Sequence, residues 1–232
     1  MPTFARSDEL DPLSYFGEWP SLRSATGRVD IHSLAAFWVH ASKVVGDYYE
    51  FGVATGRSAI AAIRAARLYG DPAPERFHLF DSFEGLPELS GVDVGSDQFK
   101  QGDYAVGQAQ VIEHFKQRHV WNPARIAFYP GWYEQSLTPA LQSELTLSPA
   151  SIVHIDCDLY ESARVVLDFI TPILQAGSIV LIDDWNCFKA SNQRGLRRAI
   201  GEWVSNATTP WVLEHYANYG WHGVAFLVDS RG

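Results

Sequence analysis

Short apolar runs alternate with helix-like stretches along most of this chain, and no other feature of the sequence restricts its fold as strongly. The runs are rich in β-branched and aromatic residues and lie at 48–53, 76–81, 125–129, 151–156 and 179–182. Helical patterns lie between and around them, at about 31–45, 57–69, 104–119, 158–175 and 192–204. Strands that alternate with helices in this way are typical of a parallel sheet with crossover helices.

The end of the chain departs from this alternation. Two β-rich runs, 211–216 and 224–228, are joined by the turn-prone residues 217–220, a pattern that predicts an antiparallel hairpin. The sequence therefore predicts an α/β, Rossmann-like, doubly wound and mostly parallel sheet of about seven strands with a C-terminal antiparallel hairpin.

Nothing in the sequence divides the chain into separate parts. Its 232 residues suit one large domain, and no linker rich in Pro, Gly and Ser interrupts them. We expect a single domain over 1–232, with a polar lead-in at 1–30. Residues 82–104 form a long, Gly-rich, irregular stretch, and a loop of that length inside a compact domain is typical of a lid.

Charge and composition narrow the class of partner. Eighteen basic against twenty-seven acidic side chains give a formal net charge of -9, which argues against a broad nucleic-acid or anionic-membrane surface. No stretch approaches the ~18 apolar residues of a membrane span, and the first residues do not resemble a signal peptide. Cys157 and Cys187 lack the spacing of a metal knuckle, so we expect reduced thiols in a cytoplasmic protein.

Ligands of open parallel sheets bind at the carboxyl ends of the strands, so the residues there are the candidates for a site. The first strand runs into a turn that contains Gly52 and Gly56 and then into a helix, an arrangement that brings backbone close to a ligand. A tight turn without a ligand remains an alternative. The dinucleotide fingerprint would require glycine at Ala54 and Arg57, so it is not met. Glu50, just before the turn, suits a ligand with an ammonium group better than a pyrophosphate.

Acids end three further strands. Asp81 closes the second strand, where a carboxylate can accept hydrogen bonds from both hydroxyls of a ribose, or act only as a turn residue. Asp156 and the pair Asp183 and Asp184 end two strands that we expect to be neighbours. Three converging carboxylates repel one another unless a cation or protons intervene, and oxygen ligands favour Mg²⁺, Ca²⁺ or Mn²⁺ over zinc. The alternative is three turn residues that never converge.

Two other polar residues receive structural interpretations. Asp158 has the spacing of a helix N-cap, three residues before Glu161. His154 lies inside an apolar strand, which favours a core histidine with satisfied hydrogen bonds over a catalytic base.

Five segments, taken in order, resemble the macrocin O-methyltransferase family, whose members are class I S-adenosylmethionine-dependent enzymes that methylate sugar hydroxyls of natural products. The resemblance covers about 48–199. The segments read YEFGVATGRS, LFDSFEGLPE, YPGWYEQSL, IDCDLYESA and GSIVLIDDW.

The resemblance implies roles for the matching positions. The glycine turn would hold the methionine part of S-adenosylmethionine, and Asp81 would bind its ribose. Ser82 and Phe83 would lie beside the adenosine, and Gly131 and Trp132 would border the adenine. Asp156, Asp183 and Asp184 would hold Mg²⁺, and Asp156 would be the candidate for accepting the proton of the acceptor. The implied cofactor-binding set is Glu50, Gly52, Val53, Thr55, Gly56, Ser58, Asp81, Ser82, Phe83, Gly131 and Trp132.

The resemblance implies a small-molecule acceptor and a homodimer or larger oligomer. It is poor over 92–104, a region that commonly shapes the acceptor pocket, so the acceptor is not identified. Three rival functions remain: a nicotinamide-dependent oxidoreductase, a non-catalytic scaffold, and a catechol-type metal-dependent methyltransferase that acts on an aromatic diol. Cofactor binding separates the first two from an O-methyltransferase, and acceptor screening separates the third.

Overall fold

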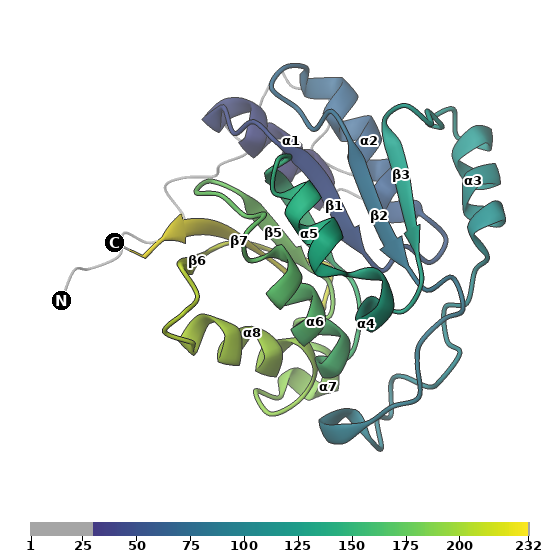
Figure 1. Cartoon of the computed structure of the whole chain (residues 1–232), viewed down its shortest axis with the longest axis vertical. Helices are drawn as coiled ribbons and strands as arrows, with labels where there is room; N and C mark the ends of the chain where they lie inside the picture. Colours follow the sequence, from purple (N-terminus) through teal and green to yellow (C-terminus); the bar gives the residue numbers. More distant parts are fainter. Residues whose placement is uncertain (1–29, 232) are drawn as a thin grey trace.

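A seven-stranded sheet forms the centre of the protein, whose computed structural model describes residues 30–231. The strand order is β3-β2-β1-β4-β5-β7-β6 (Figure 1). The first five strands run parallel, and β7 is antiparallel to both β5 and β6. The strands are β1 (Asp47–Phe51), β2 (Phe77–Asp81), β3 (Ile126–Pro130), β4 (Ala150–Ile155), β5 (Ile179–Ile182), β6 (Trp211–Tyr219) and β7 (Gly223–Ser230). The predicted mixed sheet with its terminal hairpin is confirmed.

Helices cover both faces of the sheet. One face packs against α1 (Ile31–Ser42), α2 (Arg57–Tyr69) and α3 (Gln108–Gln117). The other packs against α4 (Tyr133–Ser136), α5 (Pro139–Leu145), α6 (Tyr160–Ile170) and α8 (Gly195–Ser205), as Figure 1 shows. A short 3₁₀ helix, η2 (Gly91–Asp93), and α7 (Cys187–Ala190) lie in the connections. Among the described residues, no helix is both long and apolar enough to cross a membrane.

The central strands are buried on both faces, which explains their unbroken apolar sequences. Every residue of β1, β4 and β5 is buried. Alternate residues point to opposite faces, so Tyr48 packs towards α1 and α2 while Phe51 packs towards α6. The rings of Phe51, Phe80 and Tyr129 stack across three neighbouring strands at centroid separations of 4.7 and 4.4 Å.

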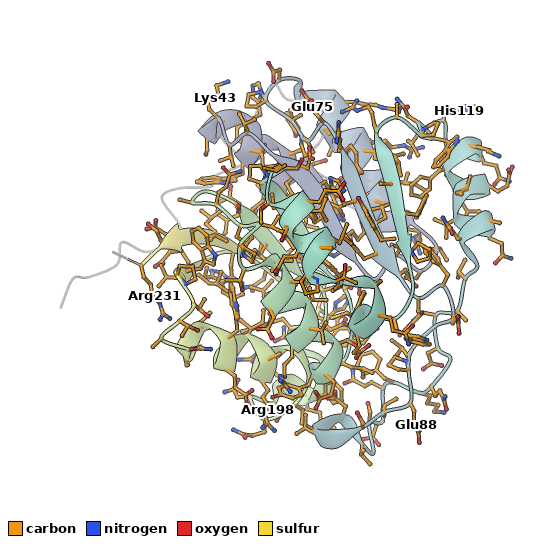
Figure 2. The ribbon with its side chains drawn as sticks, in the orientation of Figure 1. Lys43, Glu75, Glu88, His119, Arg198 and Arg231 are labelled. Carbon is orange, nitrogen blue, oxygen red and sulfur yellow. The ribbon has the colours of Figure 1, made fainter. Side chains whose placement is uncertain are left out.

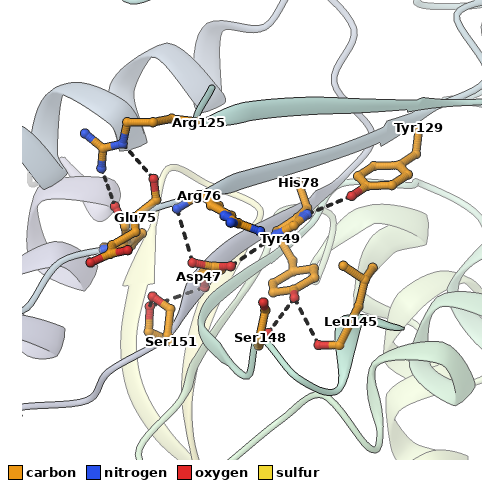
Figure 3. Close-up of polar contacts among 12 residues, drawn as sticks. Asp47, Tyr49, Glu75, Arg76, His78, Arg125, Tyr129, Leu145, Ser148 and Ser151 are labelled. Carbon is orange, nitrogen blue, oxygen red and sulfur yellow. Dashed lines mark hydrogen bonds and ion pairs between the residues drawn. The ribbon is translucent and has the colours of Figure 1, made fainter. Parts of the chain in front are cut away.

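A polar network links β1, β2 and β3 through side chains of all three strands (Figure 3). Asp47 of β1 accepts a hydrogen bond from the backbone N–H of Arg76 at 3.1 Å and contacts His78 of β2 at 3.1 Å. The other ring nitrogen of His78 lies 3.0 Å from the hydroxyl of Tyr129 in β3. These buried groups satisfy one another, so the network has a structural role. Exposed charged residues labelled in Figure 2, such as Lys43 and Glu88, lie at the rim of that view.

The structure differs from the sequence-based expectations in several places. Asp158 does not cap α6: its backbone is left-handed (φ 60°), and Asp93 instead accepts a hydrogen bond from the Tyr160 N–H at 2.7 Å. The helix ends at Ile170, before the proline at position 172. The hairpin turn lies at 220–222, because β6 continues to Tyr219. Of the expected lead-in at 1–30, residues 1–29 lie outside the described residues.

Candidate active site

A cavity of about 510 Å³ opens at the carboxyl ends of the parallel strands, with the irregular stretch after β2 forming part of its wall. That volume is within the range of ~300–1000 Å³ typical of small-molecule sites. Eight of the predicted site residues line it: Gly52, Asp81, Ser82, Gly131, Trp132, Asp156, Asp183 and Asp184. The remaining six do not line it: Glu50, Val53, Thr55, Gly56, Ser58 and Phe83.

The two glycines of the turn after β1 are required by packing inside the protein. A Cβ on Gly52 would lie 1.7 Å from the backbone oxygen of Asp156, and one on Gly56 would lie 2.4 Å from the ring of Phe115. Both residues also have positive φ, at 95° and 76°. Gly52 therefore lets β1 and the residue after β4 meet at the cavity floor, while Gly56 seats the start of α2 against α3.

Glu50 is fully buried beneath the turn. Its carboxylate accepts hydrogen bonds from the hydroxyls of Tyr48 and Ser58, each at 2.5 Å. Burial raises the pKa of Glu50 to about 7, although both hydrogen bonds oppose that rise. Because Glu50 does not reach the cavity surface, it supports the turn from below.

Asp81 organises the turn through its side chain. One carboxylate oxygen accepts hydrogen bonds from the N–H groups of Val53 at 2.6 Å and Ala54 at 3.0 Å, and the other accepts from Phe83 at 2.6 Å. The turn-residue alternative is therefore realised in the structure. Each carboxylate oxygen has two lone pairs, so the oxygen that faces Phe83 retains capacity for a ligand hydroxyl.

Carboxylates from β4 and β5 converge on the cavity floor. Asp156, Asp158 and Asp184 offer oxygen atoms that all lie within 4.8 Å of one another, and Asp183, Asp184 and His222 form a second such group. Asp184 belongs to both groups, so the predicted set of Asp156, Asp183 and Asp184 is divided between them. The alternative in which these acids never converge is wrong.

Burial and mutual repulsion raise the pKa values of the carboxyl groups in this cluster. Burial, followed by the charges of Asp183 and Asp184, raises the pKa of Asp156 well above its ordinary value. Burial and the charge of Asp184 do the same for the pKa of Asp158. Burial and the charge of Asp183 raise the pKa of Asp184 to about 6. These groups resist carrying their negative charges together.

The cluster fits a divalent cation. One oxygen of Asp184 is buried with no hydrogen-bond partner, while the other accepts from the Cys187 thiol at 3.3 Å. Buried carboxylate oxygens without partners are costly, and a cation would satisfy them. Hard oxygen ligands suit Mg²⁺ or Ca²⁺.

Sequence reasoning missed the place of Asp158 and of the hairpin turn. The spacing of Asp158 predicts a helix cap, but its left-handed backbone places it in the carboxylate cluster. Its position two residues after Asp156 at a strand end was the available signal. His222 reaches the site from the turn between β6 and β7, with its ring nitrogen 3.5 Å from the Asp183 carboxylate, a contact that no local pattern indicates.

One wall of the cavity is anchored through a buried aspartate. Asp93 is 1% exposed and accepts hydrogen bonds from the N–H of Tyr160 and, at 3.2 Å, of Gly195, so it caps α6 and α8 together. Arg194 donates to the carbonyls of Val92 and Val94, both at 2.8 Å. The irregular stretch is therefore tied to the helix that begins beside Asp158.

His154 is buried in β4 as expected, but its hydrogen bonds are not satisfied. Neither of its ring nitrogens has a hydrogen-bond partner among the described residues. Burial lowers the pKa of His154 well below its ordinary value, so it is neutral. Its ring stands edge-on to that of His32 at a centroid separation of 5.3 Å. It does not line the cavity and is not placed to act as a base there.

The charge of the cavity wall is one-sided. Among the described residues that line it, none is lysine or arginine. Six carboxylic acids line it: Asp81, Glu134, Asp156, Asp158, Asp183 and Asp184. Such a wall attracts cationic ligands and repels a pyrophosphate.

Comparison with protein families and curated sequences gives consistent matches. The family model described as Macrocin-O-methyltransferase (TylF) matches residues 16–206. The chain is 32% identical over 185 residues to the 8-demethyl-8-(2,3-dimethoxy-alpha-L-rhamnosyl)-tetracenomycin-C 4'-O-methyltransferase of Streptomyces olivaceus, covering 76% of this chain and 68% of that one. It is 27% identical over 154 residues to the demethyldecarbamoylnovobiocin O-methyltransferase of Streptomyces niveus, covering 62% of this chain but only about half (54%) of that relative.

Solved structures show the same fold. The O-methyltransferase NovP superposes with a TM-score of 0.67 at 22% identity, covering 87% of this chain and 78% of that one. The calicheamicin methyltransferase CalS11 superposes with a TM-score of 0.68 at 22% identity, covering 85% and 77%. At this level of identity the likeness concerns the fold.

Proposed function

The chain belongs to the macrocin O-methyltransferase family, and we propose that it transfers a methyl group from S-adenosylmethionine to a hydroxyl group of a sugar or another natural-product small molecule. The observation that carries this proposal is the cavity wall of six carboxylic acids without lysine or arginine among the described residues. A sulfonium cofactor with an ammonium group suits that wall. A nicotinamide dinucleotide does not, because its pyrophosphate would meet carboxylates and no Gly-rich fingerprint.

The cofactor would lie across the ends of β1, β2 and β3. Asp81 has an oxygen with capacity for a ribose hydroxyl, and Ser82, Gly131 and Trp132 line the wall next to it. Its sulfonium end would then point over Gly52 towards the carboxylates. The groups beneath the wall, including Glu50 and Ser58, would hold the turn that carries these contacts.

Methyl transfer is an in-line displacement at carbon, and the cofactor already activates the methyl group. The chain's contribution is to align the acceptor oxygen with the methyl carbon and to exclude water. The carboxylates of the cluster accept hydrogen bonds from the acceptor hydroxyls and so orient them. An aliphatic hydroxyl must also lose its proton, and Asp156 or Asp158, whose pKa values are raised by burial, would be the carboxylate that accepts it.

Two groups of residues could hold Mg²⁺: Asp156 and Asp158 with Asp184, or Asp183 and His222 with Asp184. When bound, such a cation lowers the pKa of a hydroxyl that it contacts. The residues that hold the cation are poor bases, so one carboxylate of the cluster would have to remain outside the coordination shell to take the proton.

The test is a methyl-transfer assay with labelled S-adenosylmethionine, with and without a metal chelator. The acceptor panel pairs sugar glycosides with a catechol, and mass spectrometry identifies methylated products. We expect the glycosides to be methylated, and we expect the chelator to lower the yield of methylated product. Methylation of the catechol alone would establish the catechol-type alternative instead, and no methylation of any acceptor would contradict the proposal.

The remaining expectations belong to the same proposal. We expect one domain with residues 82–104 as a lid, a cytoplasmic protein, and a homodimer or larger oligomer. The acceptor would be a small molecule, with neither nucleic acid nor membrane as partner. Sedimentation analysis and an acceptor screen test these points.

A further inference from the structure

Tyr219 carries a buried hydroxyl and does not line the active-site cavity. It is the last residue of β6 and pairs with Gly223, the first residue of β7. Its hydroxyl oxygen has no hydrogen-bond partner at ordinary geometry among the described residues. A buried hydroxyl without a partner costs free energy, so packing alone does not account for a tyrosine at this position.

The register of the sheet places Tyr219 in one row with Asp183. Ile182, at the end of β5, pairs with Val224 of β7. The next opposite positions are therefore Asp183 and Gly223, and Gly223 also pairs with Tyr219. Residues that stand opposite one another in neighbouring strands present their side chains to the same face. Asp183 and Tyr219 thus share a face, one on each side of Gly223.

Gly223 leaves the space between these two side chains open. A Cβ on Gly223 would lie 2.3 Å from Cε2 and 2.4 Å from Cζ of the Tyr219 ring, so the ring lies directly over the glycine backbone. Two strand spacings amount to about 10 Å. Because Cζ carries the hydroxyl and already lies over the middle strand, the tyrosine extends from β6 across β7 towards the end of β5.

The electrostatics of the pair agree with this placement. Burial raises the pKa of Tyr219 well above its ordinary value, and the charge of Asp183 raises it further, ahead of the other carboxylates. Burial also raises the pKa of Asp183, and two histidines and the Tyr219 hydroxyl oppose that rise. The hydroxyl and the carboxylate therefore face each other, and a small rotation of either side chain joins them.

The backbone of Asp183 is already held from the same hairpin. His222 places its ring nitrogen 2.6 Å from the Asp183 carbonyl oxygen. The carboxylate of Asp183 is less constrained, because its contact with the same ring is longer, at 3.5 Å. A second donor is needed to fix the orientation of its two oxygens, and the Tyr219 hydroxyl is available for that.

We propose that Tyr219 is a positioning residue for Asp183: its hydroxyl donates a hydrogen bond to one carboxylate oxygen and so orients the other towards a divalent cation. This inference rests on the proposed function, in which the carboxylates of the site hold Mg²⁺. Groups that hydrogen-bond a metal ligand orient it, and their removal lowers metal affinity by about 10–100-fold.

Calorimetric titration of the full-length protein with MgCl₂ tests this role, and thermal unfolding in chelator or in Mg²⁺ gives a second readout. The variants are Tyr219→Phe, which removes only the hydroxyl, and Asp183→Asn. Tyr216→Phe is the matched control, because it removes a hydroxyl from the same strand. Tyr216 packs against Trp38 at a centroid separation of 5.4 Å, and burial alone raises its pKa.

We expect Tyr219→Phe to raise the Kd for Mg²⁺ about tenfold, and Asp183→Asn to raise it at least as much. Tyr216→Phe should leave the Kd unchanged. In chelator, Tyr219→Phe should unfold at the wild-type temperature or slightly above it, because the variant lacks a buried hydroxyl without a partner. Mg²⁺ should then raise its Tm less than it raises that of the wild type.

An unchanged Kd in Tyr219→Phe would overturn the inference, as would an equal rise in Tyr216→Phe. A lower Tm of Tyr219→Phe in chelator, with an unchanged Kd, would assign the residue to packing alone. Absence of Mg²⁺ binding by the wild type, or wild-type affinity in Asp183→Asn, would also overturn it. The proposed function fails separately: it is contradicted if the wild type binds Mg²⁺ in this Tyr219-dependent way but methylates no acceptor.

Discussion

Replacing Asp184 by Asn should stabilise the protein at neutral pH when no divalent cation is added. Asp184 is buried among like charges, and its pKa is raised from 3.8 to about 6. A carboxyl with a raised folded-state pKa contributes stability below its unfolded pKa and loses that contribution as the pH rises through the folded value. The loss therefore develops between about pH 4 and pH 6 and is complete above it. The Asn side chain carries no charge to repel its neighbours and keeps an oxygen for the Cys187 thiol.

The magnitude follows from the pKa. A rise of two units corresponds to about 3 kcal/mol at 1.36 kcal/mol per unit, and coupling to the neighbouring carboxylates reduces the gain to about 1–3 kcal/mol. For a domain of this size that is an increase of about 3–10 °C in Tm. Mg²⁺ at roughly ten times its Kd should stabilise the wild type by about 1.4 kcal/mol and raise its Tm accordingly. The same Mg²⁺ should leave the Tm of Asp184→Asn nearly unchanged.

Thermal unfolding followed by circular dichroism at pH 4.5 and pH 7.5, with chelator or with Mg²⁺, measures both effects. Asp168→Asn, an exposed change on α6, is the matched control and should change neither. The reasoning is refuted if Asp184→Asn unfolds at a lower temperature than the wild type in chelator at pH 7.5, because the carboxylate would then be stabilising. Equal gains at the two pH values would also refute it.

The remaining predictions concern packing, capping and thiol reactivity. Gly52→Ala should lower the free energy of unfolding by several kcal/mol or prevent folding, because its Cβ would lie 1.7 Å from a backbone oxygen. The Cβ of Gly201→Ala in α8 would meet nothing within 4 Å, so this variant should be more stable by about 0.5–1 kcal/mol. Urea unfolding measures both changes. Asp93→Asn should lower the free energy of unfolding by about 1–3 kcal/mol, because one of the two oxygens that cap α6 and α8 is replaced by an NH₂ donor. Asp97→Asn, at an exposed position, is the control and should leave the stability almost unchanged. Both cysteines are buried with raised thiol pKa values, so alkylation at pH 8 should be slow until urea unfolds the chain, and rapid labelling of the native protein would contradict that burial.

Local patterns predicted much of the fold because its central strands are buried on both faces and its helices are amphipathic. The run at 179–182 is an unbroken apolar strand, and the helix at 57–69 has the predicted bounds. The two short helices α4 and α5 were not predicted. They span four and seven residues, and the second depends on the Thr138 side chain, which accepts from the Leu141 N–H at 3.2 Å. So short a periodic pattern carries little signal.

The candidate site was predictable where strand ends determine it and not where distant segments meet. The rule that ligands lie at carboxyl ends located Asp81, Asp156 and the pair at the end of β5. It did not show that Asp158 joins them, because a spacing that suits a cap also suits a strand-end turn. It also did not show that Asp93 caps α6 across 67 residues of chain, since no local pattern reports a contact of that range.

Calorimetric titration with S-adenosylhomocysteine tests the central claim most directly. The account predicts that the wild-type chain binds the ligand with a Kd of about 10 μM or lower, equivalent to about -7 kcal/mol. Asp81→Ala should abolish that binding, and the exposed Asp168→Ala should retain it. No heat of binding with or without Mg²⁺, or undiminished binding by Asp81→Ala, would contradict a cofactor site at the ends of β1 and β2.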